Sequence, residues 1–335
     1  MGTDQPVRRR PLWMRVLLVF LLLLLLAAAG FCWRPFSTLQ TGVRIWLRFH
    51  GVHSEYAQAG PYRIHYLVAG SGQPIVLLHG MGSQGQDWGG TIVALAKSEK
   101  VYAIDMIGHG DSDKPVDADY SIALQARVVR DFLDSQHIER ADVVGISMGG
   151  MTALRFAAEY PQRVRRLVVS GAPAIGSTPA VSMDVYFPQT EAELRDFNHA
   201  LTPLEWNLPG FVARDYLRYR HPTEWVMRRV LDGVLRNRAA LANGVDQIKV
   251  PVLLVWGDKD LVAPLSGEEY LHTRMPQSDV VILTGCGHVA VHDCSGEATP
   301  AIRRFFLADA PPVGEVRRIA HKARLTDYLG QPDEN

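Results

Sequence analysis

Cysteine is scarce in this chain, internal repeats are absent, and no charge of either sign predominates. The 335 residues include three cysteines, and 35 basic side chains balance 35 acidic ones. Because an odd and sparse set of cysteines is no disulfide framework, we expect Cys32, Cys286 and Cys294 to be free thiols, although the last two could pair. The balanced charge gives no indication of a nucleic-acid partner.

One long hydrophobic run stands near the N-terminus. Residues 1–15 are polar and rich in arginine, and residues 16–33 are uncharged, dominated by leucine and about long enough to cross a bilayer. A cleaved signal peptide is the alternative, with small residues at positions 27–30. Because the run extends to Trp33, we favour a single-pass signal anchor. The arginines before it predict a cytoplasmic N-terminus and a catalytic domain on the non-cytoplasmic side, although arginines after the run oppose this orientation.

The segments that flank the expected catalytic domain carry weaker signals. Residues 34–60 mix aromatic and basic side chains, which suit either the lipid headgroup zone or a solvated linker, and we expect a juxtamembrane linker there. Residues 308–335 are polar and charged after two prolines, and we expect a C-terminal tail without chemistry.

From Pro61 onward, short apolar runs alternate with helical patterns. The length of the chain allows one large domain with an insertion. Strands alternating with helices predict an α/β fold whose mostly parallel sheet is covered by helices on both faces. We place this core at residues 61–173 and 248–307. The expected strands are residues 62–69, 74–78, 101–105, 141–146, 166–170, 250–256 and 279–283.

Between residues 174 and 247 the strand pattern stops. A capping box at Thr190–Glu193 opens a helix, and residues 214–220 and 224–237 also have helical patterns. The interval is rich in arginine and in aromatic side chains, namely Phe187, Phe197, Trp206, Phe211, Tyr216 and Trp225. We interpret it as a helical cap over the site.

The stretch from Ala141 to Tyr160 predicts a strand, a tight turn and a helix. Its run from Gly145 to Gly149 matches G-x-S-x-G, the pattern of a nucleophile elbow. A side chain at either glycine would collide with the neighbouring strand or helix, and the turn would present the Ser147 hydroxyl. A glycine-rich turn with a structural serine is the alternative interpretation.

A serine nucleophile needs a base, and His288 is the best placed of the histidines. It ends the run Gly285–His288 directly after the last expected strand, where small glycines allow a loop to reach the elbow. His79, His109 and His292 are the rivals, and position favours His288.

The acid that would orient this base follows the strand that ends at Trp256. Asp258 and Asp260 both stand there, and a carboxylate at this strand end can face the histidine loop. Taking Ser147, Asp260 and His288 in chain order gives the order Ser, Asp, His that is typical of α/β-hydrolases.

From about residue 60 to 307 the chain resembles an α/β-hydrolase of the serine-nucleophile, cap-bearing type. The matching segments are residues 79–82, 108–112, 145–150, 256–260 and 285–288. The layout also resembles the membrane-anchored monoacylglycerol lipase branch of the α/β-hydrolase-domain proteins. The resemblance implies that Asp260 is the catalytic acid and that the backbone N–H groups of Met81 and Met148 form the oxyanion hole. His292 departs from the family pattern.

The resemblance implies a serine hydrolase that cleaves carboxylic esters without a cofactor. We expect a membrane-tethered lipase or esterase that acts on monoacylglycerol-like lipids through an acyl-enzyme on Ser147. No metal is expected, because His288 and His292 lack the glutamate of H-E-x-x-H. The alternatives are a carbon–carbon bond hydrolase or perhydrolase acting on a non-lipid substrate, and a non-catalytic membrane-attached binding protein of the same fold.

Overall fold

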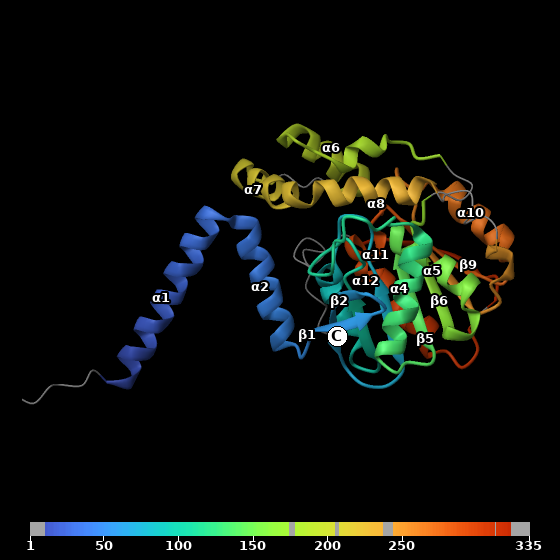
Figure 1. Cartoon of the computed structure of the whole chain (residues 1–335), viewed down its shortest axis with the longest axis horizontal. Coiled ribbons are helices and arrows are strands. Elements are labelled where there is room, and N and C mark those ends of the chain that lie inside the picture. Colours follow the sequence, from blue (N-terminus) through green and yellow to red (C-terminus); the bar gives the residue numbers. More distant parts are fainter. Residues whose placement is uncertain (1–10, 174–177, 205–207, 237–243, 312, 323–335) are drawn as a thin grey trace, which may run out of the picture.

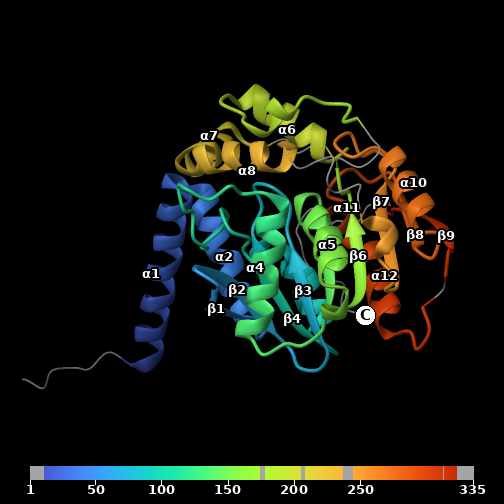
Figure 2. The ribbon, with the colours of Figure 1, turned by 45° about the vertical axis from the view of Figure 1, so that its right-hand side comes forward.

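The fold is organised around one twisted sheet with helices on both faces and a helical cap above one end (Figure 1). The computed structural model describes residues 11–173, 178–204, 208–236, 244–311 and 313–322. A 45° turn shows the same layers and places helices α1 and α2 beside the core (Figure 2). The α/β class expected from the sequence is confirmed.

The sheet has nine strands among the described residues, in the order β1-β2-β4-β3-β5-β6-β7-β8-β9. The pairs β1–β2 and β2–β4 are antiparallel, and every other pair is parallel. Strands β3 and β7 are apolar throughout because helices cover both faces of the sheet. The bounds are β1 (His53–Ala59), β2 (Tyr62–Ala69), β3 (Pro74–Leu78), β4 (Lys100–Ile104), β5 (Ala141–Ile146), β6 (Val164–Ser170), β7 (Val252–Gly257), β8 (Asp279–Thr284) and β9 (Val316–Ala320).

Alternate residues of each central strand face opposite hydrophobic layers. In β5, Val143 faces the layer that contains α4 (Ile122–Ser135) and α5 (Met148–Glu159), whereas Val144 faces the other layer. That second layer is formed by α3 (Gly89–Leu95), α11 (Ala290–Asp293) and α12 (Ser295–Leu307), and α10 (Leu265–Arg274) follows β7 in the chain. The sheet is therefore sandwiched, and its strand ends point toward the cap.

The cap consists of short helices above the carboxyl ends of the strands (Figure 1). They are a 3-10 turn at Met183–Tyr186, α6 (Glu191–Leu201), α7 (Gly210–Arg220), a 3-10 turn at His221–Thr223 and α8 (Glu224–Arg236). The predicted capping box is present, since the Thr190 side chain accepts from the Glu193 N–H. The helix expected from residue 214 begins earlier, at Gly210. Trp206, one of the aromatic residues assigned to the cap, and Asn237, the expected end of the last cap helix, lie outside the described residues.

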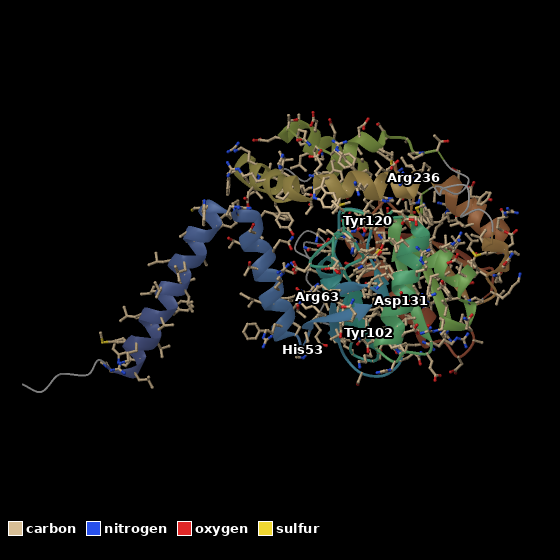
Figure 3. All side chains as sticks on the ribbon, viewed as in Figure 1. His53, Arg63, Tyr102, Tyr120, Asp131 and Arg236 are labelled. Carbon is tan, nitrogen blue, oxygen red and sulfur yellow. A yellow bond between two sulfur atoms is a disulfide. The ribbon has the colours of Figure 1, made fainter. Side chains whose placement is uncertain are left out.

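Two helices precede the sheet. Among the described residues, α1 (Leu12–Trp33) is the one helix whose length and mean hydropathy of 2.8 suit a membrane span, and none of its residues is buried in the protein. Figure 3 shows its side chains projecting on all sides of the helix. The arginines at positions 8–10, which predict a cytoplasmic N-terminus, lie outside the described residues.

The expectation of a linker at residues 34–60 is wrong. This stretch forms α2 (Pro35–Phe49) and β1, whose pairing with β2 runs from His53 opposite Val68 to Ala59 opposite Tyr62. Pro35 occupies the first turn of α2, where its missing N–H costs nothing, and Leu47 is buried against the core. Packing against the domain, rather than local composition, gives this segment its structure.

Within the expected C-terminal tail, residues 316–320 form a strand of the sheet. Strand β9 pairs in parallel with β8 and adds an edge to the sheet. Its alternating residues Arg317 and Ile319 are half-buried, and Ile319 packs on the second hydrophobic layer. Two adjacent arginines interrupt the apolar residues of this strand, so its sequence carries only a weak strand signal.

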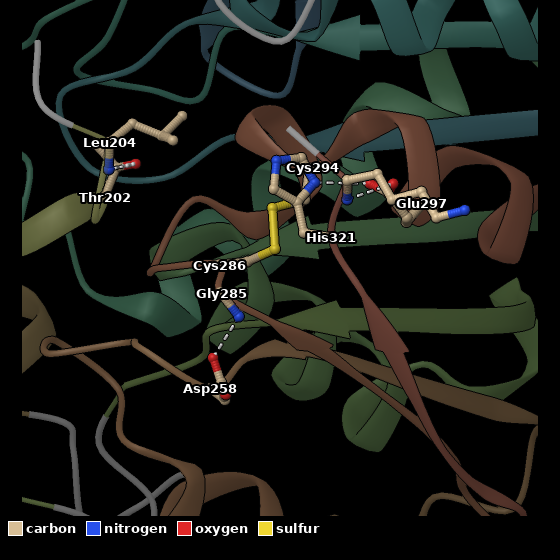
Figure 4. Close-up of a disulfide and its surroundings, with 9 residues drawn as sticks. Thr202, Leu204, Asp258, Gly285, Cys286, Cys294, Glu297 and His321 are labelled. Carbon is tan, nitrogen blue, oxygen red and sulfur yellow. Dashed lines mark hydrogen bonds and ion pairs between the residues drawn. A yellow bond between two sulfur atoms is a disulfide. The ribbon is translucent and has the colours of Figure 1, made fainter. Parts of the chain in front are cut away.

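The expectation of free thiols is wrong for two of the three cysteines. Cys286 and Cys294 form a disulfide, and Cys32 is free and exposed. The short helix α11 folds the chain back so that the two Cα atoms lie 6.4 Å apart. Figure 4 shows His321, which follows β9, beside this disulfide, where its Nδ1 lies 2.9 Å from an oxygen of Glu297. The bridge therefore links the loop after β8 to the start of α12.

Replacing both Cys286 and Cys294 with alanine should lower the free energy of unfolding by about 2–3 kcal/mol, because a bridge that closes so short a loop restricts the unfolded chain. Guanidinium unfolding followed by circular dichroism measures the change. The matched control is Cys32→Ala, which should leave the free energy of unfolding unchanged. An equal free energy in the double variant and the wild type would contradict a stabilising bridge.

Candidate active site

The turn between β5 and α5 holds Ser147 in a conformation that side chains rarely adopt, with φ +55° and ψ −120°. Its N–H donates to the Ser170 carbonyl at 2.9 Å. A Cβ on Gly145 would lie 2.2 Å from the Gly149 oxygen, and one on Gly149 would lie 2.2 Å from the Leu78 oxygen. The predicted need for glycine at both positions is therefore confirmed.

The structure brings the three predicted residues together. The Ser147 Oγ lies 2.8 Å from Nε2 of His288, and Nδ1 of His288 lies 2.9 Å from Oδ2 of Asp260. All three side chains are buried. Asp260 Oδ1 also accepts from the backbone N–H groups of Val262 and Ala263, at 2.9 and 2.7 Å, which fixes the carboxylate plane.

The rival acid, Asp258, has a different place. Its Oδ1 accepts from the Gly285 N–H at 2.7 Å and so ties the loop after β7 to the loop after β8. Figure 4 shows this bond next to Cys286, one of the two cysteines of the disulfide. Asp258 thus supports the histidine loop, whereas Asp260 contacts the histidine itself.

The loop that carries His288 is held from several sides. A Cβ on Gly257 would lie 2.3 Å from the carbonyl oxygens of Cys286 and Gly287, so glycine is required for the loop to close on β7. The His288 N–H donates to the carbonyl of Leu201, the last residue of α6 in the cap, at 2.7 Å. Cap, sheet and disulfide together position the imidazole.

The rival histidines have other surroundings, since His79 and His109 are buried and His292 is half-buried. Nε2 of His79 accepts from the Met106 N–H at 3.0 Å, and the His79 and His109 rings lie 5.0 Å apart. The His292 ring packs edge-on against Trp88 at 4.6 Å. Burial lowers the pKa of His79, lowers that of His109 to about 3 and lowers that of His292 to about 4. These histidines are therefore neutral near pH 7 and serve packing.

The predicted oxyanion donors flank the serine. Met148 is the first residue of α5, where backbone N–H groups point out of the helix, and Met81 follows Gly80 in the loop after β3. A Cβ on Gly80 would lie 3.2 Å from the Ser147 Cβ, so this loop runs directly beside Ser147. Met81 and Met148 also line the same cavity as Ser147.

Among the described residues, one cavity lies at Ser147 beneath the cap, and a larger one lies within the cap itself. The one at Ser147, of about 40 Å³, is narrow and almost wholly apolar. The larger one, of about 320 Å³, has charged walls that include Arg218, Arg220 and Glu224. The first is lined by Met81, Ser147, Met148, Met151, Pro173, Pro179, Met183, Tyr186, Leu231, Val234, Leu235 and Val262.

Tyr186 lines both cavities, and sequence reasoning did not single it out. It lies beside Ser147 in the narrow apolar cavity, and burial raises the pKa of its phenol far above its usual range. Its ring packs against Phe197 at 5.5 Å, and its carbonyl accepts from Arg220 at 2.9 Å. Tyr186 belongs to a single 3-10 turn without periodic pattern, so the sequence carries no signal for its position.

A parallel sheet, an elbow serine, a carboxylate-oriented histidine and a helical cap together define the α/β-hydrolase fold. The chain belongs to this family, since the family model described as alpha/beta hydrolase fold matches residues 73–293.

Relatives in the family differ in their named activities. The chain is 33% identical over 250 residues, which cover 68% of it and 85% of the relative, to the 2-hydroxy-6-oxononadienedioate/2-hydroxy-6-oxononatrienedioate hydrolase of Paraburkholderia phymatum. It is 24% identical over 302 residues, which cover 84% and 90% of the two chains, to the monoacylglycerol lipase ABHD6 of Mus musculus. The predicted resemblance to the monoacylglycerol lipase branch is thereby confirmed.

A solved structure extends the likeness. The crystal structure of a membrane phospholipase A, a bacterial virulence factor, superposes with a TM-score of 0.74 at 26% identity, covering 87% of this chain and 98% of that one. These comparisons establish the family and the fold.

Replacing His292 with phenylalanine should make the protein less sensitive to acid. The folded-state pKa of about 4 lies below the usual value of 6.5, so the unfolded chain binds more protons between these values. The neutral His292 therefore imposes no penalty above pH 6.5. As the pH falls toward 4, the free energy of unfolding decreases by up to about 1.4 kcal/mol per pH unit for this one histidine.

Denaturant unfolding at a series of pH values between 4 and 7 measures this slope. His292→Phe should remove one histidine's share of it, whereas the control His53→Phe, at an exposed position of β1, should not. Equal slopes in wild type and His292→Phe would show that His292 is not the acid-sensitive group.

Proposed function

We propose that this protein is a membrane-tethered serine hydrolase that cleaves carboxylic esters of monoacylglycerol-like lipids. One observation carries the proposal: the hydrogen-bonded series Asp260, His288 and Ser147 opens onto an apolar cavity. This arrangement is that of a nucleophile, a general base and the acid that orients the base.

In the first step, His288 acts as general base. Its Nε2 lies 2.8 Å from Ser147 Oγ and takes the proton as the oxygen attacks the ester carbonyl. The Nδ1–H donates to Asp260, which keeps the ring in the required tautomer and stabilises the imidazolium. Because the two N–H groups of Val262 and Ala263 hold the carboxylate, this tautomer is favoured before substrate binds.

The tetrahedral intermediate places negative charge on the former carbonyl oxygen. The N–H groups of Met81 and Met148 are the donors we assign to it, and loss of one such donor typically costs about 3 kcal/mol of transition-state stabilisation. His288 then protonates the leaving alcohol, which leaves an acyl-enzyme on Ser147. A water molecule deprotonated by His288 attacks this ester and releases the acid.

The surroundings support a lipid substrate. Four methionines line the cavity at Ser147, and their flexible apolar side chains suit an alkyl chain. The exposed apolar helix α1 supports attachment to a bilayer. Lipases and a membrane phospholipase A stand among the relatives and similar structures, which supports the same substrate class.

A second candidate is hydrolysis of a carbon–carbon bond in a carboxylated substrate. The larger cavity carries Arg218 and Arg220, whose guanidinium groups suit carboxylates, and the named dienedioate hydrolase is 33% identical. The apolar walls directly at Ser147 favour the lipid ester instead.

Ser147→Ala should abolish ester turnover and labelling by a fluorophosphonate probe while the fold is retained, because the attacking oxygen is gone. The assay uses p-nitrophenyl esters and monoacylglycerols of graded chain length together with a 2-hydroxy-6-oxodienoate. The matched control is Ser170→Ala, a buried serine at the end of neighbouring β6, which should keep its labelling.

Turnover of the esters supports the proposed lipase. Turnover of the dienoate alone would favour the carbon–carbon hydrolase, and a folded wild type that neither labels nor turns over any substrate would indicate a binding protein. Ester turnover retained in a folded Ser147→Ala variant would reject the nucleophile.

The two neighbouring aspartates provide a paired test of the acid. Asp260→Asn should lower kcat by about 10²–10⁴-fold because the imidazole loses its preferred tautomer. Asp258→Asn should change kcat less than about threefold, since an amide oxygen can still accept from the Gly285 N–H. Equal losses in the two variants would contradict the assignment of Asp260.

A further inference from the structure

The junction between α1 and α2 is bonded to the cap rather than to the sheet. Asp215 of α7 is buried, and its two carboxylate oxygens are shared between two donors. Oδ1 accepts from Nε of Arg34 at 2.6 Å, and Oδ2 accepts from the Phe36 N–H at 2.9 Å. Phe36 lies in the first turn of α2, where backbone N–H groups have no partner within the helix. A carboxylate of the cap thus accepts a hydrogen bond from the N-terminus of α2.

Aromatic contacts extend this junction along one face of α7. The Phe36 ring packs against Tyr216 at 4.9 Å and against Tyr219 at 5.0 Å. Phe31, near the end of α1, packs edge-on against Phe211 at 5.8 Å. Positions 211, 215 and 219 are four residues apart and therefore form a stripe along the helix. This stripe faces the N-terminal helices.

The C-terminal end of the same helix reaches the active site. Arg220, the last residue of α7, donates to the Tyr186 carbonyl at 2.9 Å and to the Tyr216 hydroxyl at 3.0 Å. Its guanidinium also lies over the Phe197 ring at 4.9 Å. Tyr186 in turn lines the cavity at Ser147. One short helix therefore connects the end of α1 with the wall of the catalytic cavity.

We propose that Asp215 clamps the cap to the point where α1 leaves the bilayer, so that the cap and the mouth of the cavity rest on the membrane surface. The inference depends on the proposed function, because it takes the substrate to be a lipid ester held in that bilayer. The buried Asp215 carboxylate has its two hydrogen-bond partners only while Arg34 and Phe36 stay in place. Separating α7 from the junction would therefore leave a carboxylate without its partners, which is costly.

The surface around this clamp fits a bilayer. Phe211 and Trp225 are 43% and 41% exposed on the cap, and Phe211 contacts Phe31 of α1, a helix without buried residues. Arg218 lies on the same helix α7, where its charge suits lipid phosphates. Continuity with α1 identifies the partner of this face as lipid.

The test compares two substrates on full-length protein in phosphatidylcholine–phosphatidylglycerol liposomes. One substrate is a long-chain monoacylglycerol held in the bilayer, and the other is p-nitrophenyl butyrate in the water phase. Asp215→Asn should lower kcat/KM for the monoacylglycerol at least tenfold and change kcat/KM for the butyrate less than twofold. Arg34→Gln should have the same effect, and the double variant should be no worse than either single variant.

The matched control is Asp232→Asn in α8, which removes an exposed carboxylate ion-paired with Arg236 in the cap (Figure 3). It should leave both substrates unaffected. Equal losses on both substrates, together with a lower melting temperature, would make Asp215 a general stabiliser and overturn the proposal. So would unchanged activity on both.

A fluorophore reports the membrane contact directly, and it serves equally if Asp215→Asn does not fold. In a Cys32→Ser background, an environment-sensitive dye on Phe211→Cys should shift to shorter emission wavelength on reconstitution, and Arg34→Gln should reduce this shift. An unchanged emission wavelength on reconstitution of the labelled protein with Asp215 and Arg34 intact would overturn the proposal. Failure of the wild type to hydrolyse p-nitrophenyl butyrate would instead overturn the proposed function.

Discussion

The backbone of Ser147 is the constraint on which the rest of the structure depends. A non-glycine residue at positive φ costs of order 1–3 kcal/mol and persists only where its surroundings hold it. Here the turn is held by the Ser147 N–H bond to Ser170 and by a helix that approaches strand β3 within reach of the Leu78 oxygen. Only glycine at positions 145 and 149 permits this approach, so the tight packing of α5 keeps the hydroxyl at the edge of the sheet.

His288 lies at the same edge of the sheet as Ser147, the edge formed by the carboxyl ends of the parallel strands. The loops after β7 and β8 are neighbours because their strands pair in parallel, which brings Asp260 and His288 to the elbow across 28 residues of sequence. The Asp258 bond to Gly285, the disulfide and the Leu201 carbonyl fix the histidine loop from three directions. In the proposed mechanism, His288 is therefore within reach of Ser147 before substrate arrives, so the base needs no reorganisation in the transition state.

The sequence predicts those parts of the molecule whose geometry is local. The strands, the glycines of the elbow and the capping box at Thr190 each need only a few neighbouring residues, and the order Ser147, Asp260, His288 follows from strand ends. What it does not predict depends on distant partners. Helix α2 and strand β1 are stabilised by the domain, the cysteines pair because α11 turns the chain, and Asp215 meets Arg34 across 181 residues. Composition alone carries none of this.

The proposed extraction of a lipid from the bilayer gives these distant contacts a common purpose. Moving an acyl chain from a bilayer into water costs about 0.8 kcal/mol for each methylene group, so a substrate that crosses water on its way to Ser147 meets a large barrier. An apolar cavity offsets this cost only if its mouth adjoins the lipid. A cap bonded to the end of α1 satisfies that condition, and because α7 also carries Arg220, which contacts Tyr186, the same helix sets both the entrance and the wall beside the nucleophile. Anchor, cap and serine then form one functional unit.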